Sequence, residues 1–180
     1  MPTIKRIAHQ LESTDGAEIA EAALVLPLVF MLLLGIVWFG RAFNIYSTIQ
    51  QAAQQGAITA ARSTCVTCGN GLPNDATVTG VVKNVMQASN LDPTQIKIAN
   101  PGLIACPVPA PPGSCTATID NITICRNVQL NPTSAVGTPQ PIQCGSAVSF
   151  QYPFTFYLPF TSLNMSQIIL SAQAQSRMEN

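Results

Sequence analysis

The uncharged apolar run Ala22–Gly40 constrains this chain more than any other feature. Its nineteen residues would form a helix roughly 28 Å long, which is enough to cross the hydrocarbon core of a bilayer. Pro27 and Gly35 would weaken a soluble helix, but membrane helices tolerate both because neighbouring groups satisfy the freed backbone. We therefore predict a transmembrane segment at residues 22–40.

Residues 1–16 precede the run and mix basic and acidic side chains without a sustained apolar face, as expected of a short cytoplasmic leader. A cleaved secretory signal is the alternative, but its apolar core usually spans only about 7 to 15 residues and a small-x-small site follows it. Arg41-Ala42-Phe43-Asn44 offers no such site. Lys5 and Arg6 before the run, against Arg41 close behind it, also favour a cytoplasmic N-terminus.

The helical pattern continues beyond Arg41. Apolar and small residues recur near one side of the continued helix, namely Phe43, Ile45, Ile49, Ala52, Ala53, Gly56 and Ala60. The pattern predicts one helix of about 45 residues over 17–63. Two helices with a break near Arg41 are the alternative, although no Gly-Pro pair marks that join.

Residues 64–180 are expected to form a small head. A helix is predicted by apolar residues at helical spacing, which are Val78, Val81, Val82, Val85 and Met86; Asn74 or Asp75 can cap its start, and Leu91-Asp92-Pro93 ends it. Strands are predicted by β-branched or alternating runs at Gln95–Ile98, Cys115–Ile119, Ile122–Cys125, Val148–Tyr152 and Gln167–Met178.

Two of these strands allow more detail. Pro153 and Pro159 restrict the strand at Val148–Tyr152 to a sheet edge, a bulge or an early stop. In the last strand Leu170, Ala172 and Ala174 alternate with Ser171, Gln173 and Gln175, so the two sets should lie on opposite faces. The predicted fold is α+β, with the long helix followed by a head of one helix and an antiparallel sheet of about four strands, held by disulfides.

All six cysteines follow the apolar run: Cys65, Cys68, Cys106, Cys115, Cys125 and Cys144. An even number on one side of a membrane segment predicts disulfides formed in an oxidising compartment, and six thiols allow fifteen pairings. Cys65-Val66-Thr67-Cys68 also has the C-x-x-C spacing of a redox pair or half a zinc site. Because the single histidine, His9, lies before the span, zinc would lack ligands, so we predict structural disulfides and neither a metal nor a cofactor.

The sequence offers no catalytic constellation. With His9 in the leader, no Ser-His or Cys-His arrangement can form beyond the span, and the acids there are scattered over different elements: Asp75, Asp92, Asp120 and Glu179. A formal net charge of zero argues against nucleic acid. Only 9% of residues are charged, which suits a surface that packs against neighbouring proteins. We therefore predict that the protein is not an enzyme and has no small-molecule substrate.

The start of the apolar run carries a resemblance to a known family. Gly16-Ala17-Glu18-Ile19-Ala20-Glu21, followed by Ala22-Ala23-Leu24-Val25-Leu26-Pro27, resembles the N-terminus of the TadE-like family, the minor pseudopilins of the tight-adherence (Flp, or type IVc, pilus) apparatus. An aromatic residue commonly follows that glutamate in the family, and Ala22 stands there in this chain. Residues 146–179 also resemble the strand pair that ends TadE-like domains.

The resemblance implies a structural role in a pilus machine. A prepilin peptidase would cut between Gly16 and Ala17, and Glu21 would pair with the new amine of Ala17 on a neighbouring subunit. It further implies a single-pass protein of the bacterial inner membrane with a periplasmic, pilin-like head. Its partners would be that peptidase, other pilins or pseudopilins, and inner-membrane assembly proteins.

Two other functions remain open at this point. The first is an uncleaved, single-pass envelope protein whose disulfide-bonded head binds a periplasmic or extracellular partner. The second is a membrane-tethered thiol oxidoreductase that uses Cys65 and Cys68.

Overall fold

A computed structural model describes residues 14–62, 71–106, 114–118, 120–131, 141–155 and 167–178. The contacts between residues divide the chain after Ala42 into two compact units, and each unit is described by itself. Cys65, Cys68 and Pro159 lie outside the described residues, as do residues 1–13 of the expected leader.

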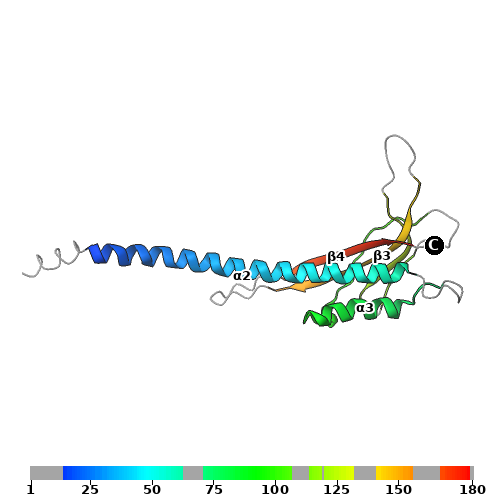
Figure 1. Ribbon diagram of the computed structural model, residues 1–180, viewed down its shortest axis with the longest axis horizontal. Helices are drawn as coiled ribbons and strands as arrows, with labels where there is room; N and C mark the ends of the chain where they lie inside the picture. Colours follow the sequence, from blue (N-terminus) through cyan, green and yellow to red (C-terminus); the bar gives the residue numbers. More distant parts are fainter. Residues whose placement is uncertain are drawn as a thin grey trace, which may run out of the picture. The chain divides into compact units, whose positions relative to one another are not determined.

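The first element is the helix α2, Thr14–Ala61, which is a single continuous helix (Figure 1). The alternative with a break near Arg41 is therefore wrong. Pro27 lies inside the helix, where its ring removes one backbone donor. In the first unit most of the large apolar side chains of α2 are exposed, with exposed fractions between 47% at Val25 and 75% at Phe39. A helix that is apolar all round and uncovered is suited to lipid rather than water.

The C-terminal part of α2 belongs to the second unit, the head. Its small residues Ala52, Ala53, Ala57 and Ala60 are buried, as is Ile49. This confirms the predicted face of the helix, except at Phe43, whose side chain is 65% exposed. Small side chains bring the helix axis close to its neighbours, so the face predicted from sequence is a packing face.

The second helix, α3, spans Asp75–Ala88. The Asn74 side chain accepts a hydrogen bond from the Thr77 backbone N–H at 2.8 Å, which satisfies a donor that the first turn leaves free. Val78, Val82 and Met86 are fully buried, at the spacing expected for one helix face. The chain leaves the helix through Asn90, whose φ of 56° lies in the left-handed region.

The strand predicted at Gln95–Ile98 is wrong. Pro93–Gln95 forms the short 3-10 helix η1, whose first turn is capped by the Asp92 carboxylate, and only Lys97 makes an isolated β-bridge, with Gln151. Proline fixes φ near the helical value and the Asp92 side chain accepts from the Thr94 N–H at 2.9 Å, so local capping outweighs the alternating pattern.

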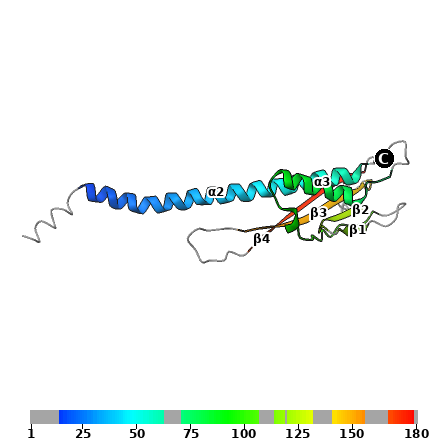
Figure 2. The ribbon, with the colours of Figure 1, turned by 90° about the horizontal axis from the view of Figure 1, so that it is seen from below.

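Four strands form one antiparallel sheet in the order β1-β2-β3-β4, which follows the order of the chain (Figure 2). Their bounds are β1 Ser114–Ala117, β2 Thr123–Gln129, β3 Cys144–Phe154 and β4 Ile168–Arg177. The predicted α+β fold with an antiparallel sheet is thus confirmed. The strands around Cys125 and Val148 are longer than the sequence suggested, because pairing with neighbours extends them past the β-branched residues.

Pro153 does not have the effect predicted for it. The strand that contains it, β3, lies in the middle of the sheet and continues through Pro153 to Phe154. Odd-numbered residues of β3 direct their backbone groups toward β2, but β2 begins at Thr123, which pairs with Ser149. The missing N–H of Pro153 therefore faces a side where β2 has already ended, and no ladder bond is lost.

The core lies between the sheet and the two helices. Ile49 from α2, Val82 and Met86 from α3, and Val148 and Phe150 from β3 belong to one buried cluster. Figures 1 and 2 show α3 and the C-terminal part of α2 along the same side of the sheet. A smaller cluster on the opposite face is formed by Cys125, Val128 and Ala147, with Leu103 and Leu130 packed against it.

Candidate functional site

The N-terminal turns of α2 hold the residues that the sequence singled out. Gly16 is exposed, and a Cβ at that position would meet no atom within 4 Å. Glu21 is exposed as well, and no ion pair reaches it from the residues that the structure describes. Ala17 lies between them on the same helix. Among the described residues no counter-charge reaches this acid, and an acid directly before an apolar run needs water or an opposite charge to stabilise it in a membrane.

The apolar part of α2 is long and apolar enough to cross a membrane; the described residues contain one such candidate span, within Glu18–Ala61. At the C-terminal end of the apolar run, the Arg41 guanidinium lies over the Trp38 ring, 5.6 Å from its centroid. Trp and Arg together are typical of the boundary between a bilayer and water, where an amphipathic ring and a long charged side chain both reach the headgroups.

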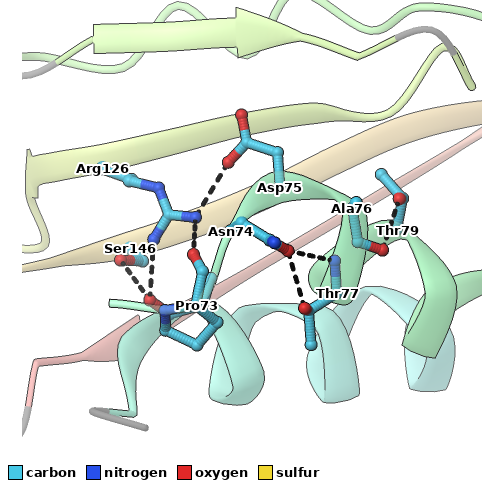
Figure 3. Close-up of polar contacts among 9 residues, drawn as sticks. Pro73, Asn74, Asp75, Ala76, Thr77, Thr79, Arg126 and Ser146 are labelled. Atoms are coloured by element: carbon cyan, nitrogen blue, oxygen red, sulfur yellow. Dashed lines mark hydrogen bonds and ion pairs between the residues drawn. The ribbon is translucent and has the colours of Figure 1, made fainter. Parts of the chain in front are cut away.

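Within the head, Arg126 gathers polar groups from three segments (Figure 3). Its Nη2 donates to the Pro73 carbonyl at 2.6 Å and lies 2.8 Å from the Asp75 carboxylate, and its Nη1 donates to the Ala60 carbonyl at 3.3 Å. The Ser146 hydroxyl also donates to the Ala60 carbonyl, at 3.4 Å. Carbonyls in the last turn of a helix have no partner within it, so Arg126 and Ser146 supply donors for the end of α2.

A bulge in β2 places Arg126. The register between β2 and β3 shifts between Cys125 and Val128, and Asn127 has a φ of 54°. Sequence reasoning missed Arg126, because nothing in its local pattern distinguishes it from a solvated strand residue. The chemistry of the cluster is that of a structural link, since Arg126 joins acceptors of its own chain at the end of α2 and the start of α3.

Two disulfides staple the head. Cys115 and Cys125 are directly opposed on β1 and β2 and are bonded, and Cys106 is bonded to Cys144 at the start of β3. Of the six candidates, these four lie within the described residues, and none of the four is free. Within the same residues no group of His, Cys, Asp or Glu side chains is arranged to hold a metal ion.

Two groups in the head have shifted pKa values. The backbone N–H of Thr94 lowers the pKa of the exposed Asp92 carboxyl. Burial raises the pKa of the Tyr152 hydroxyl. Both shifts reinforce the ordinary state at neutral pH, an ionised Asp92 and a neutral Tyr152, so neither group is prepared for proton transfer.

These features define a class of protein: a disulfide-stapled α+β head that follows a long helix with a candidate membrane span. Within this class, residues 16–57 match the family model described as TadE-like protein, in agreement with the resemblance seen in the sequence. The match includes Gly16 and Glu21 and ends within the part of α2 that packs in the head. No curated protein and no solved structure matches the chain.

Proposed function

We propose that this chain is a minor pseudopilin that takes part in assembling a Flp-type pilus. The observation that carries the proposal is the match of residues 16–57 to the TadE-like family, which covers both Gly16 and Glu21. In this role the N-terminus is cytoplasmic, α2 spans the inner membrane and the head lies in the periplasm. An oxidising periplasm agrees with the two disulfides of the head.

The proposed processing step is a cut between Gly16 and Ala17 by a prepilin peptidase. Both residues are helical in α2, which begins at Thr14. Glycine is a poor helix former and the first turn of a helix frays, so the segment can open to admit a peptidase. The cut releases residues 1–16 and gives Ala17 a free amine, four residues before Glu21.

The proposed assembly step is an ion pair between Glu21 of one subunit and the Ala17 amine of the next. Both charges would stand at the edge of hydrocarbon, where each relieves the desolvation of the other. The pairing would give a counter-charge to an acid that directly precedes an apolar run and that no ion pair from the described residues reaches. The other partners in this role are pilins, further pseudopilins and inner-membrane assembly proteins.

Processing is tested by the N-terminus of the protein from a host that has the matching peptidase. Mass spectrometry should find a chain that begins at Ala17. Gly16→Val should prevent the cut, because it adds a β-branched side chain directly before the cleaved bond, where glycine has none. An intact Met1 in that host would refute the cleaved form and favour a permanently anchored envelope protein.

The ion pair is tested by Glu21→Ala in the same host. Membrane insertion and cleavage should be unchanged, since removing an acid from the apolar edge makes insertion easier. Pilus formation should fall at least tenfold, because the neighbouring amine then lacks its counter-charge. Glu18→Ala is the matched control, since Glu18 lies one turn farther from the apolar run and should be dispensable. Normal piliation by a cleaved Glu21→Ala protein would contradict the pairing.

A further inference from the structure

Among the described residues, no strand pairs with the outer edge of β4, the last strand of the sheet. The backbone N–H and C=O of Gln151 both bond to Lys97, on the side of β3 away from β4. Odd-numbered residues of β3 therefore direct their backbone N–H and C=O toward β2, and even-numbered residues direct theirs toward β4. In β4, Ala172 and Ala174 pair with even-numbered residues of β3, so the backbone groups of Ala172 and Ala174 bond to β3. The odd-numbered residues Ile169, Ser171, Gln173, Gln175 and Arg177 therefore direct their backbone groups outward, and all five are exposed.

This edge lacks the usual protection against pairing. β4 contains no proline, its ten-residue register with β3 is unbroken, and Arg177 at its end is its one charged residue. Natural sheets commonly protect an edge of this length with lysine, proline, a bulge or a covering segment. From the described residues, Gln50 on α2 reaches the edge, where its Nε2 donates to the Ser171 carbonyl at 3.2 Å. A carbonyl has two lone pairs, so this bond leaves Ser171 able to accept another.

The opposite edge of the sheet, β1, also presents backbone groups. Thr123 and Cys125 in β2 pair with odd-numbered residues of β3 and so bond toward β3. Their partners in β1, Ala117 and Cys115, then direct their N–H and C=O away from β2. Both residues are exposed.

Two β4 strands are poorly placed to pair with each other. Gln50 of α2 contacts Ser171, and the Ala60 carbonyl contacts Ser146, whose partner in β4 is Ser176, so α2 and β4 run in the same direction. Antiparallel pairing of two β4 strands by a two-fold axis would turn the two α2 helices in opposite directions. The candidate span precedes the head in the chain, so copies anchored in one bilayer need the part of α2 that lies in the head to run in the same direction, which this arrangement does not give.

We infer that β4 of one copy pairs with β1 of the next copy. Three antiparallel pairings separate β1 from β4, so the two edges run antiparallel to each other. A second copy shifted sideways, without being turned over, therefore offers its β1 to β4 in the antiparallel arrangement and keeps its α2 in the same direction. Such a contact is heterologous and leaves a free edge at each end, so it can repeat along a row of anchored copies. The inference rests on the membrane anchoring in the proposed function but not on leader cleavage.

The side chains at these edges permit the pairing. Ser171, Gln173 and Gln175 would lie opposite the small residues Cys115 and Ala117, and no charged residue is among them. Since β1 has four residues, the pairing provides only a few hydrogen bonds and is weak between free heads. Anchoring in one membrane raises the effective concentration of the second edge, which favours a contact of this strength.

The test is photo-crosslinking of the full chain in membranes of a host that has neither a prepilin peptidase nor pilus proteins. Two differently tagged copies are co-expressed, and a benzophenone side chain replaces Gln175. Adducts between the two tags should form, and peptide mapping should place them at residues 114–117. The same probe at the position of Asn84, which is exposed on α3, is the control and should give at most a tenth of that yield. Because this host assembles no pilus, the outcome is independent of the assembly tests of Glu21.

A blocking variant makes the test specific to backbone pairing. Gln173→Pro removes an outward N–H and leaves the ladder with β3 intact, so it should lower the adduct yield at least fivefold, whereas Gln173→Thr should not. Ala117→Pro removes an outward N–H of β1 in the same way. It replaces Gln173→Pro in the test if Gln173→Pro lowers the unfolding temperature, and it should lower the adduct yield by the same factor. Adducts that map to β4 of the second copy, an absence of adducts between tags, or an unchanged yield in both folded proline variants would overturn the inference.

Discussion

At the scale of single residues, Arg126 is the position on which the head depends most. It lies on strand β2 and contacts the end of α2 and the start of α3, and each of these contacts spans more than fifty residues of chain. The contact is one cation against two carbonyls and one carboxylate, so its loss would take a donor from each of the three, and the Ala60 carbonyl would keep the Ser146 hydroxyl alone. Such unsatisfied groups usually destabilise more than the net gain from the bond itself.

We therefore expect Arg126→Met to destabilise the head by about 1 to 3 kcal/mol, because the stem still packs but each of the three acceptors loses the donor that Arg126 supplies. Asp75→Asn is the matched control. The Asp75 side chain is 38% exposed, so solvent screens its ion pair and the loss should stay below about 1 kcal/mol. Thermal unfolding of the full chain in detergent measures both. Equal effects of the two variants would show that the ion pair, rather than the carbonyl contacts, matters.

At the scale of elements, the sequence predicts the helices and strands whose residue pattern lies within the element itself and extends over many residues. The apolar run and the helical pattern that continues beyond it specify α2. The spacing of Val78, Val82 and Met86 specifies α3, and alternation assigns the two faces of β4 correctly. The strand expected at Gln95–Ile98 fails because a proline and an aspartate cap compete within the same residues. Neither the central position of β3 nor the bulge that places Arg126 has a local signal, because both depend on which strands become neighbours.

Of the candidate site, Gly16 and Glu21 could be found from sequence because their spacing before an apolar run is itself the signal. The pairing of the cysteines could not, since it depends on the register that opposes Cys115 to Cys125 and on the position of Cys106 beside β2. The open edge of β4 is likewise invisible in the sequence, because its alternating pattern would be the same in a central strand.

The packing of α2 on α3 gives a prediction at this scale. A Cβ added to Gly56 would lie 2.7 Å from Cγ2 of the buried Val82, whereas one added to Gly80 would meet nothing within 4 Å. Val82 is β-branched and cannot turn away easily, so Gly56→Ala should destabilise the head by about 1 to 3 kcal/mol despite its gain in helix propensity. Gly80→Ala should stabilise it by about 0.5 to 1 kcal/mol. If both variants stabilise the head alike in thermal unfolding, the close approach of the helices is refuted.

At the scale of the whole molecule, the residues of α2 have different surroundings in the two units. In the first unit its apolar residues are exposed, as expected of a membrane segment, and in the second unit its small residues are buried in the core. The sequence placed the start of the head at residue 64, after the long helix. The core cluster of the head, however, includes Ile49, Ala53 and Ala60 of α2.

Truncation distinguishes these two boundaries. A chain that begins at Phe43 keeps every residue of the main buried cluster, so its unfolding temperature should stay within about 4 °C of that of the full chain, which corresponds to a change of no more than about 1 kcal/mol. A chain that begins at residue 64 loses all the α2 residues of that cluster and exposes the apolar faces of α3 and the sheet. Because a sheet of this size needs a covering layer to be stable, the shorter chain should lack a cooperative transition and aggregate. Calorimetry of the two purified, oxidised chains measures the difference. A cooperative transition in the shorter chain would show that the head is complete without α2, and that the buried alanines of the helix contribute little to its stability.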